Sequence, residues 1–429
     1  MTDTAPALTT ATPAAPAPTP PPVVGPSVSM GAVAPLAVVA NWLNQWRYGG
    51  GTRDLRCDFL RGFAVIAMVT DHIGGEHSWL YLLTGGNKFF ISAAEAFVFI
   101  SGLVFGIVEV SLINRQGMDA ALAKAIRRVF TLYVFTTSLT LAFALFSGLL
   151  RLPWAPKAGD GGWADWILGV LTLHRAYYLT DVLLLYVLVV FVSAFALLLM
   201  QHNYTWLVLA LSWGLWALWQ WSPQYAAFPW EIQDNSVFHF PAWQVLFING
   251  LVIGFHRRAI TRSLSGRISV WVLLVATGVL FAGSVLLYRA SLAPLVQLTG
   301  RDTAWLGSHL FEKDNVRIGR LVVFAVFMTF VFSLTTVLWQ PLQRAFGWML
   351  LPLGSHALGA YCTHLFVVGA VTKLLAAAPA RFNEQATAPM TTLVQSGGIA
   401  IVWGVIALRA PLLKLWHELC PHRDATSET

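Results

Sequence analysis

The residues best suited to chemistry lie close together near position 60, where a long apolar stretch begins. The sequence from Leu55 to Gly62 contains two arginines and an aspartate, and Asp71-His72 follows within the same stretch. Charged side chains inside a bilayer are costly, so they normally face a protein interior or a watery cavity and serve a function. This concentration of ionisable residues therefore predicts a functional site on the first membrane helix.

Arg61 and His72 share one face of that expected helix. Ten residues separate them, and at about 100° per residue this spacing places them within roughly 20° of each other, about 16 Å apart along the axis. A permanent cation can hold an anionic donor, and an imidazole can accept and return a proton at neutral pH. We interpret Arg61 as a donor-binding residue and His72 as a general base. The structural alternative is an interfacial ion pair at Arg61, with His72 reaching toward water.

Asp58 lies one helical turn before Arg61 and is expected to hold its guanidinium group. Arg56, at the start of the same helix, is a further candidate for binding the donor. These three side chains form the predicted donor-binding set.

His72 needs a partner that orients its ring. Asp71 is a catalytic candidate, but it lies about 100° around the helix from His72 and is a poorer orienting partner than a carboxylate from another helix. Glu95 can supply such a carboxylate, because it enters an otherwise apolar segment. An unpaired carboxylate there is costly, so Glu95 is expected to have a cationic or hydrogen-bonded partner.

The composition of the chain favours a membrane protein. Of its 429 residues, 57% are hydrophobic and 11% are charged, and the mean hydropathy is +0.65, whereas soluble proteins carry about 25% charged residues. The net charge of +7 does not indicate nucleic acid, because the basic residues are scattered between apolar segments. The three cysteines have no metal-ligand spacing, so no metal site is expected.

Apolar stretches of about 20 residues recur, each long enough to cross a hydrocarbon core of roughly 30 Å. The predicted fold is all-α, a polytopic transmembrane bundle of about ten helices. The expected spans are 55–76, 90–112, 126–150, 178–200, 204–221, 241–256, 268–289, 318–339, 350–376 and 393–414. The weakly apolar segment 163–173 is expected to be a short interfacial or re-entrant piece.

Three regions follow from this pattern. Residues 1–45 are rich in proline and alanine and are expected to be a disordered cytoplasmic tail. Residues 46–417 form the transmembrane domain, and 418–429 form a short cytoplasmic tail. Lysine and arginine cluster in loops that fall on one side of the membrane when the N-terminus is cytoplasmic, which predicts that orientation.

Later segments add candidates for a pocket or an acceptor site. His356 and His364 are eight residues apart on one expected helix, so they fall roughly on one face. His364 is expected to face the same cavity as His72, and His356 to form hydrogen bonds at the helix start. A haem or metal ion at these histidines has no supporting second pair.

Two alternative roles are considered for each of four other residues. Trp243 and Gln244 suit a sugar ring and its hydroxyl groups, and simple anchoring at the membrane interface suits them equally well. Asp181 either interacts with the N-terminus of its helix or binds the acceptor. Arg320 can attract an anionic acyl group, but an arginine satisfied at the interface is the default.

Several motifs in order resemble those of the OpgC family, the succinyltransferases of osmoregulated periplasmic glucans. The first motifs of that family's sequences resemble Leu55-Arg56-Cys57-Asp58, Arg61-Gly62 and Asp71-His72-Ile73. Its later signatures are similar to Ala94–Gly102, to Asp181 with Leu184 to Tyr186, to Ala242–Phe247, and to Leu353–His356 followed by His364-Leu365. The arginine, ten residues, histidine spacing is also similar to that of the wider acyltransferase-3 superfamily.

This resemblance implies an acyl-CoA-dependent O-acyltransferase in the bacterial inner membrane. Succinyl-CoA or acetyl-CoA would be a co-substrate from the cytoplasm, with no permanently bound cofactor, and a hydroxyl group of a periplasmic glucan or other envelope glycan would accept the acyl group. Arg61 would contact the donor, His72 would be catalytic, and Glu95 would be an active-site carboxylate. The alternatives are a transporter of a glycan, lipid or anion without covalent chemistry, which inverted repeats would favour, and a structural subunit of an envelope complex.

Overall fold

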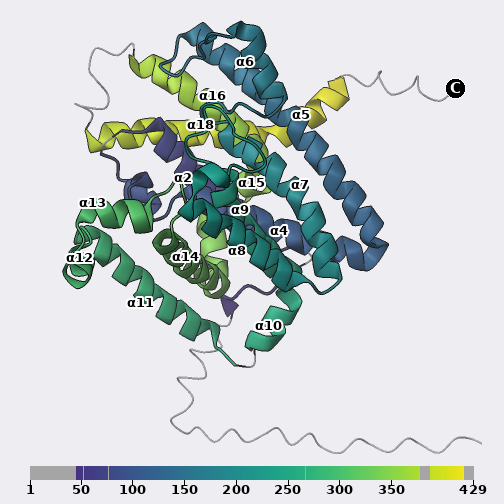
Figure 1. Ribbon diagram of the computed structural model, residues 1–429, viewed down its shortest axis with the longest axis vertical. Coiled ribbons are helices and arrows are strands. Elements are labelled where there is room, and N and C mark those ends of the chain that lie inside the picture. Colours follow the sequence, from purple (N-terminus) through teal and green to yellow (C-terminus); the bar gives the residue numbers. More distant parts are fainter. Residues whose placement is uncertain (1–44, 52, 76, 266, 377–386, 420–429) are drawn as a thin grey trace, which may run out of the picture. The chain divides into compact units, whose positions relative to one another are not determined.

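The structure, a computed structural model, describes residues 45–51, 53–75, 77–265, 267–376 and 387–419 (Figure 1). The chain divides into Met1–Gln45 and Trp46–Thr429, and every helix described below belongs to the second unit. The predicted tails 1–45 and 418–429 lie almost entirely outside the described residues. The described residues form helices and loops and no strand, which confirms the all-α prediction.

Eleven longer helices make up most of the described chain. They are α2 (Leu55–Ile73), α4 (Ala93–Gln116), α5 (Met118–Leu150), α7 (Asp181–Gln201), α8 (Thr205–Trp221), α9 (Phe240–Phe255), α11 (Val270–Arg289), α14 (Ile318–Val337), α15 (Trp339–Ser355), α16 (Ala357–Ala376) and α18 (Ala388–Leu419). The shorter elements are α3 (Tyr81–Thr84), η1 (Gly85–Asn87), α6 (Gly162–Leu171), η2 (Pro223–Tyr225), α10 (Arg257–Ser265), α12 (Ala293–Thr299), α13 (Thr303–Leu306) and η3 (Gly307–Phe311).

Seven of the helices that the structure describes are long and apolar enough to cross a membrane, namely α4, α5, α7, α11, α14, α16 and α18. The predicted number of about ten is therefore not established. The first predicted span corresponds to α2, whose 19 residues include several charged side chains, while α8 has 17 residues and α9 has 16. Segment 163–173 corresponds to the short helix α6.

One predicted span is wrong. The segment 350–376 is not a single helix, because α15 ends at Ser355 and α16 begins at Ala357, with His356 between them. Pro352 lies in the last turn of α15 and a glycine-serine pair follows it, and both features are known causes of helix interruption. His356 and His364 therefore do not share the face of one helix.

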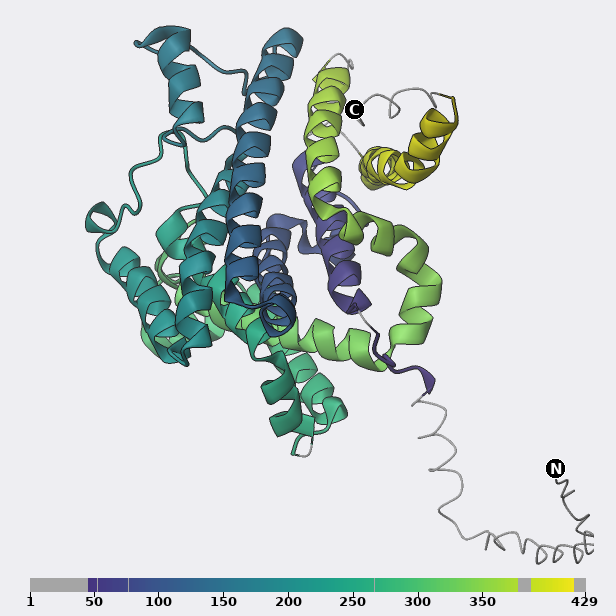
Figure 2. The same cartoon turned by 90° about the vertical axis from the view of Figure 1, so that its right-hand side faces the viewer.

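Helix α2 is packed closely against α15. A side chain built at Gly354 would place its Cβ atom 1.6 Å from the carbonyl oxygen of Asp58, and one at Gly62 would lie 2.0 Å from that of Leu350. The two backbones therefore meet where only glycine fits. Helix α2 contacts α4, α15, α16 and α18, and Figure 2 shows it with α4 on one side, α15 on the other and α16 above it.

Helices α4 and α9 form the most extensive helix pair. Gly102 and Gly106 on α4 face α9, and Gly250 and Gly254 on α9 face α4. A Cβ atom added at any of these four glycines would lie 2.1–2.3 Å from a carbonyl oxygen of the opposite helix. Glycines four residues apart allow such close approach of membrane helices. The pair thereby positions α4, whose first turn carries Glu95, beside α2.

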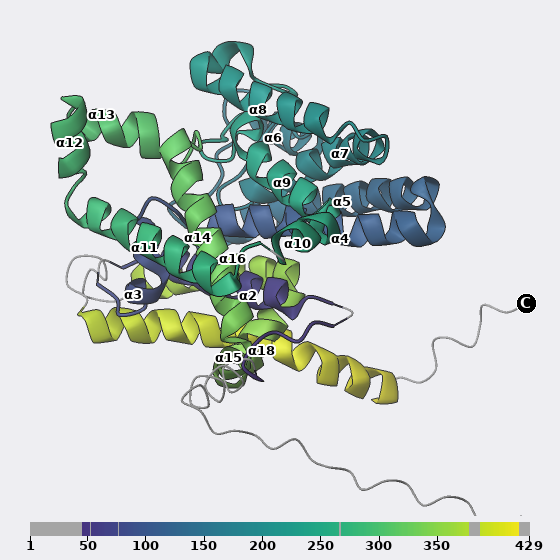
Figure 3. The same ribbon diagram turned by 90° about the horizontal axis from the view of Figure 1, so that it is seen from below.

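Helix α11 lies at the periphery, where it packs along α14 (Figure 3). None of its residues is buried within the protein, although the helix is strongly apolar. An apolar helix with this exposure is stable when lipid covers it. The exposure therefore agrees with the assignment of a membrane protein.

Candidate active site

A cluster of charged residues fixes the start of α2. Asp54 caps the helix by accepting a hydrogen bond from the backbone N–H of Arg56, and its carboxylate also pairs with the side chains of Arg56 at 2.7 Å and Arg257 at 2.6 Å. The guanidinium group of Arg56 lies 4.3 Å from the ring centres of both Tyr48 and Phe332. Arg56, a predicted donor-binding residue, is thus engaged in anchoring α2.

The prediction that Asp58 holds Arg61 is wrong. The carboxylate of Asp58 pairs with Arg53, with a nitrogen to oxygen distance of 2.7 Å. Arg61 instead donates to the hydroxyl oxygen of Ser101 at 3.1 Å, and Ser101 accepts a second hydrogen bond from Tyr186 at 3.1 Å. The helical spacing correctly predicted that Asp58 lies near Arg61. It could not predict that Arg53, which lies before the helix, is the ion-pair partner of Asp58.

The guanidinium group of Arg61 can therefore still bind an anion. No ion pair formed between described residues includes it, and its Nε atom is buried without a hydrogen-bond partner in the described part of the chain. A buried guanidinium nitrogen without a partner is costly. A negatively charged ligand at this position would remove that cost.

His72, at the C-terminal end of α2, lies beside His364 of α16. The Nδ1 atom of His72 is 2.9 Å from the Nε2 atom of His364, and the ring planes are inclined by only 23°, with centroids 5.1 Å apart. The Nδ1 atom of His364 donates to the backbone carbonyl oxygen of Tyr361. His364 is 1% exposed, whereas His72 keeps partial exposure.

Glu95 does not orient His72 through any described hydrogen bond. It lies in the first turn of α4, fully buried, and its carboxylate pairs with Arg320 of α14. The backbone N–H and the hydroxyl group of Ser92 also donate to it. The bond from the Ser92 N–H forms a capping box with the bond from the backbone N–H of Glu95 to the hydroxyl oxygen of Ser92. The expectation of a cationic or hydrogen-bonded partner for Glu95 is confirmed, since Glu95 has both, and Arg320 is occupied by this pair.

Asp71 and Lys313 add charge to the same region. The Oδ1 atom of Asp71 is buried and has no hydrogen-bond partner among the described residues. Lys313, in the loop between η3 and α14, acts electrostatically on Asp71, His72, Glu95 and Asp181. The sequence analysis did not single out Lys313. Its only signal was its position among polar residues in a long loop, because its four neighbours lie on three helices, α2, α4 and α7, that only the tertiary structure brings together.

Trp243 and Gln244 have core positions, which agree neither with sugar contact nor with anchoring at the membrane interface, the two roles considered for them. Trp243 is 0% exposed and Gln244 is 4% exposed. The indole N–H of Trp243 donates to the carbonyl oxygens of Val237 and Asp314, and the amide of Gln244 is bonded to Ser212. Trp243 thus supports the loop that carries Lys313, because Asp314 is the next residue.

His356 and Asp181 form no described hydrogen bond with the paired histidines. His356 is exposed and forms a hydrogen bond with Ser355, the residue before it. Asp181 is the first residue of α7, where its carboxylate accepts from the N–H of Val182 at 3.0 Å. This position agrees with a helix N-terminal charge, and a role of Asp181 in acceptor binding stays a prediction.

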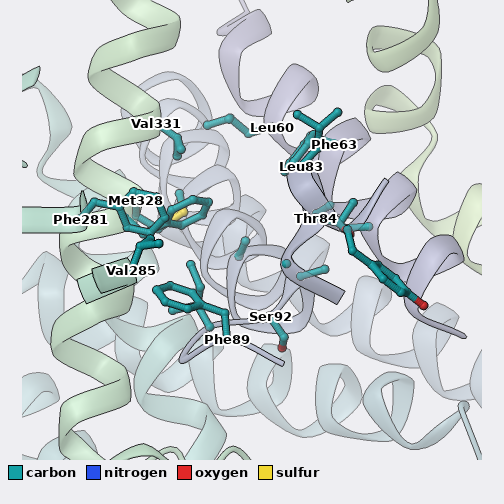
Figure 4. Close-up of a pocket in the computed structure, with 18 of the residues that line it drawn as sticks. Leu60, Phe63, Leu83, Thr84, Phe89, Ser92, Phe281, Val285, Met328 and Val331 are labelled. Atoms are coloured by element: carbon teal, nitrogen blue, oxygen red, sulfur yellow. The ribbon is translucent and has the colours of Figure 1, made fainter. Parts of the chain in front are cut away.

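An apolar cavity of about 380 Å³ adjoins this polar region but does not contain it. Figure 4 shows Phe281 and Met328 on one side of the cavity and Phe63 and Leu83 on the other. Its lining includes the α2 face that bears Leu60, but neither Arg61 nor His72. The polar side chains around His72 and Arg61 therefore lie outside this cavity.

These elements define a multi-pass helical membrane protein with ionisable side chains gathered around its first long helix. Comparison with known families then identifies the chain itself: it belongs to the OpgC protein family, whose model matches residues 53–412. The match extends from just before α2 into α18. No curated protein and no solved structure matched the chain. Membership of this family indicates a transferase with a membrane acyltransferase-like function on glucans.

Proposed function

We propose that the protein is an O-acyltransferase of the bacterial inner membrane with a cytoplasmic N-terminus. It moves a succinyl or acetyl group from cytoplasmic acyl-CoA to a hydroxyl group of an extracytoplasmic glycan, with a periplasmic glucan as the expected acceptor. The observation that carries this proposal is the imidazole of His72, which is held by the buried imidazole of His364 while the residue His72 itself is only half-buried. The family match supports the class of reaction.

In the proposed reaction His72 is the general base. A ring nitrogen of His72 takes the proton of the acceptor hydroxyl group while the hydroxyl oxygen attacks the carbonyl carbon of the thioester. The new C–O bond forms, the C–S bond breaks, and the departing thiolate of coenzyme A receives the proton from the imidazolium. The ester product and the free thiol then leave with His72 neutral again.

Arg61 binds the donor in this proposal. It lies on the same face of α2 as His72, about 16 Å further toward the start of the helix, and it lacks an ion-pair partner among the described residues. A phosphate or carboxylate of the donor supplies the missing negative charge. Donor and acceptor can then approach His72 from opposite ends of the helix.

The test compares His72→Ala with His356→Ala. Both variants remove one imidazole, but His356 is exposed and is bonded to Ser355 instead of to the paired histidines. Purified protein in lipid vesicles receives succinyl-CoA or acetyl-CoA and a glucan, and mass spectrometry measures acylated product. We expect the His72 variant to lose at least about 100-fold in rate and the His356 variant to retain its rate. Equal acylation by the two well-folded variants would remove His72 from the mechanism.

A further inference from the structure

His364 and Tyr361 together determine which nitrogen of His364 carries its proton. The carbonyl oxygen of Tyr361 can only accept a hydrogen bond, so the Nδ1 atom of His364 that bonds to it is the donor. His364 is 1% exposed, and burial favours the neutral ring. The neutral ring has one N–H group, so its Nε2 atom presents a lone pair.

That lone pair in turn determines the tautomer of His72. The Nε2 atom of His364 is 2.9 Å from the Nδ1 atom of His72, and two lone pairs would repel each other at this distance. The Nδ1 atom of His72 must therefore carry the proton and donate it. The Nε2 atom of neutral His72 is then the unprotonated nitrogen, the one able to accept a proton from a substrate.

We propose that His364 is the positioning residue of the active site, which holds His72 in the Nδ1-protonated tautomer so that its Nε2 atom is the base. This inference rests on the proposed acyl transfer. Elsewhere a carboxylate commonly orients a catalytic histidine, and here a second imidazole, tied to a backbone carbonyl, has that place. When Nε2 of His72 gains a proton, the hydrogen bond to His364 becomes charge-assisted and stabilises the imidazolium.

The surrounding packing keeps this hydrogen-bonded chain in one arrangement. Tyr361 is 2% exposed, and its hydroxyl group donates to the carbonyl oxygen of Leu179, in the loop before α7. His364 follows on the same helix one turn later, and its ring meets that of His72 edge to edge with nearly parallel planes. Three parts of the fold, α2, α16 and the loop before α7, therefore position one proton.

The test uses two substitutions at position 364. His364→Leu fills the space but removes both hydrogen bonds, whereas His364→Gln offers an amide oxygen close to the position of the original Nε2 atom. We expect the leucine variant to lower kcat about 100-fold with an unchanged KM for the acyl donor. We expect the glutamine variant to recover to within about tenfold of the wild-type kcat. His356→Leu is the matched control and should keep both constants.

A second measurement does not depend on activity. Nitrogen NMR of protein labelled with 15N-histidine distinguishes protonated from unprotonated ring nitrogens, and the His72 signals are assigned by their loss in His72→Ala. We expect a protonated Nδ1 and a bare Nε2 for His72 in the wild type and the glutamine variant, and a changed tautomer in the leucine variant. A protonated Nε2 in the neutral wild-type ring, or an unchanged kcat in the folded leucine variant, would overturn the inference. Absence of acylation by the wild type with the expected tautomer present would refute the proposed function instead.

Discussion

The ion pair between Glu95 and Arg320 allows a quantitative test of how the site is held together. Both side chains are at most 5% exposed, and the pair joins α4 to α14. Substituting Arg320 by methionine leaves the Glu95 carboxylate with its hydrogen bonds from Ser92 and the longer-range attraction of Lys313, but without its ion-pair partner. Removing one partner of a buried pair costs about 3–5 kcal/mol. We therefore expect Arg320→Met to lower the free energy of unfolding by that amount.

Two further variants separate the effect of the unpaired charge from that of the lost side chain. The double variant Glu95→Leu with Arg320→Met removes both charges, and we expect it to recover much of the lost stability, because an apolar pair of similar volume often replaces a buried ion pair without loss. Arg317→Met is the matched control, since the pair of Arg317 with Glu312 is partly exposed and such pairs contribute about 0–1 kcal/mol.

The free energy of unfolding is measured by equilibrium denaturation in detergent micelles, with tryptophan fluorescence as the signal. If Arg320→Met were no more destabilising than Arg317→Met, the carboxylate of Glu95 would not depend on Arg320. The buried-pair reasoning would then fail. A double variant less stable than Arg320→Met alone would contradict the assumption that the uncompensated charge causes the loss.

Three further outcomes follow from single positions. We expect Gly354→Ala to prevent stable folding or to lower the melting temperature strongly, because its Cβ atom would lie 1.6 Å from the carbonyl oxygen of Asp58. The control Gly283→Ala has open space around the added methyl group and should change the melting temperature little. Thermal denaturation of the two variants compares them. Burial alone would raise the pKa of Asp54, but its bonds to neighbouring arginines hold that pKa below the ordinary 3.8. The stability that Asp54 contributes is therefore complete above pH 3.8 and is lost as the pH falls through the lower folded-state pKa. Asp54→Asn should be less stable than the wild type at neutral pH and equal to it in strong acid. Arg61→Gln should raise the KM for acyl-CoA about tenfold or more at little cost in stability; an unchanged KM would exclude Arg61 from donor binding.

Much of the helical pattern was predictable from local chemistry. A chain with 57% hydrophobic residues and recurring apolar stretches must satisfy its backbone hydrogen bonds within helices when it lies in lipid. The need of Glu95 for a cationic partner was also predictable, because burial of a carboxylate is costly wherever its helix lies. The break at His356 was not predicted, because hydropathy continues across it. The only sequence signals of the break are Pro352 and the Gly354-Ser355 pair.

The sequence by itself determined the α-helical class, the concentration of ionisable residues on α2, and the shared face of Arg61 and His72, because helical periodicity depends on neighbours along the chain. Only the tertiary structure decided the partners: Arg53 for Asp58, Arg320 for Glu95, and His364 for His72. The last two pairings join residues 225 and 292 positions apart. Their geometry depends on which helices pack together, and it is helix packing through glycines and buried side chains, not local periodicity, that brings distant polar groups within hydrogen-bond distance.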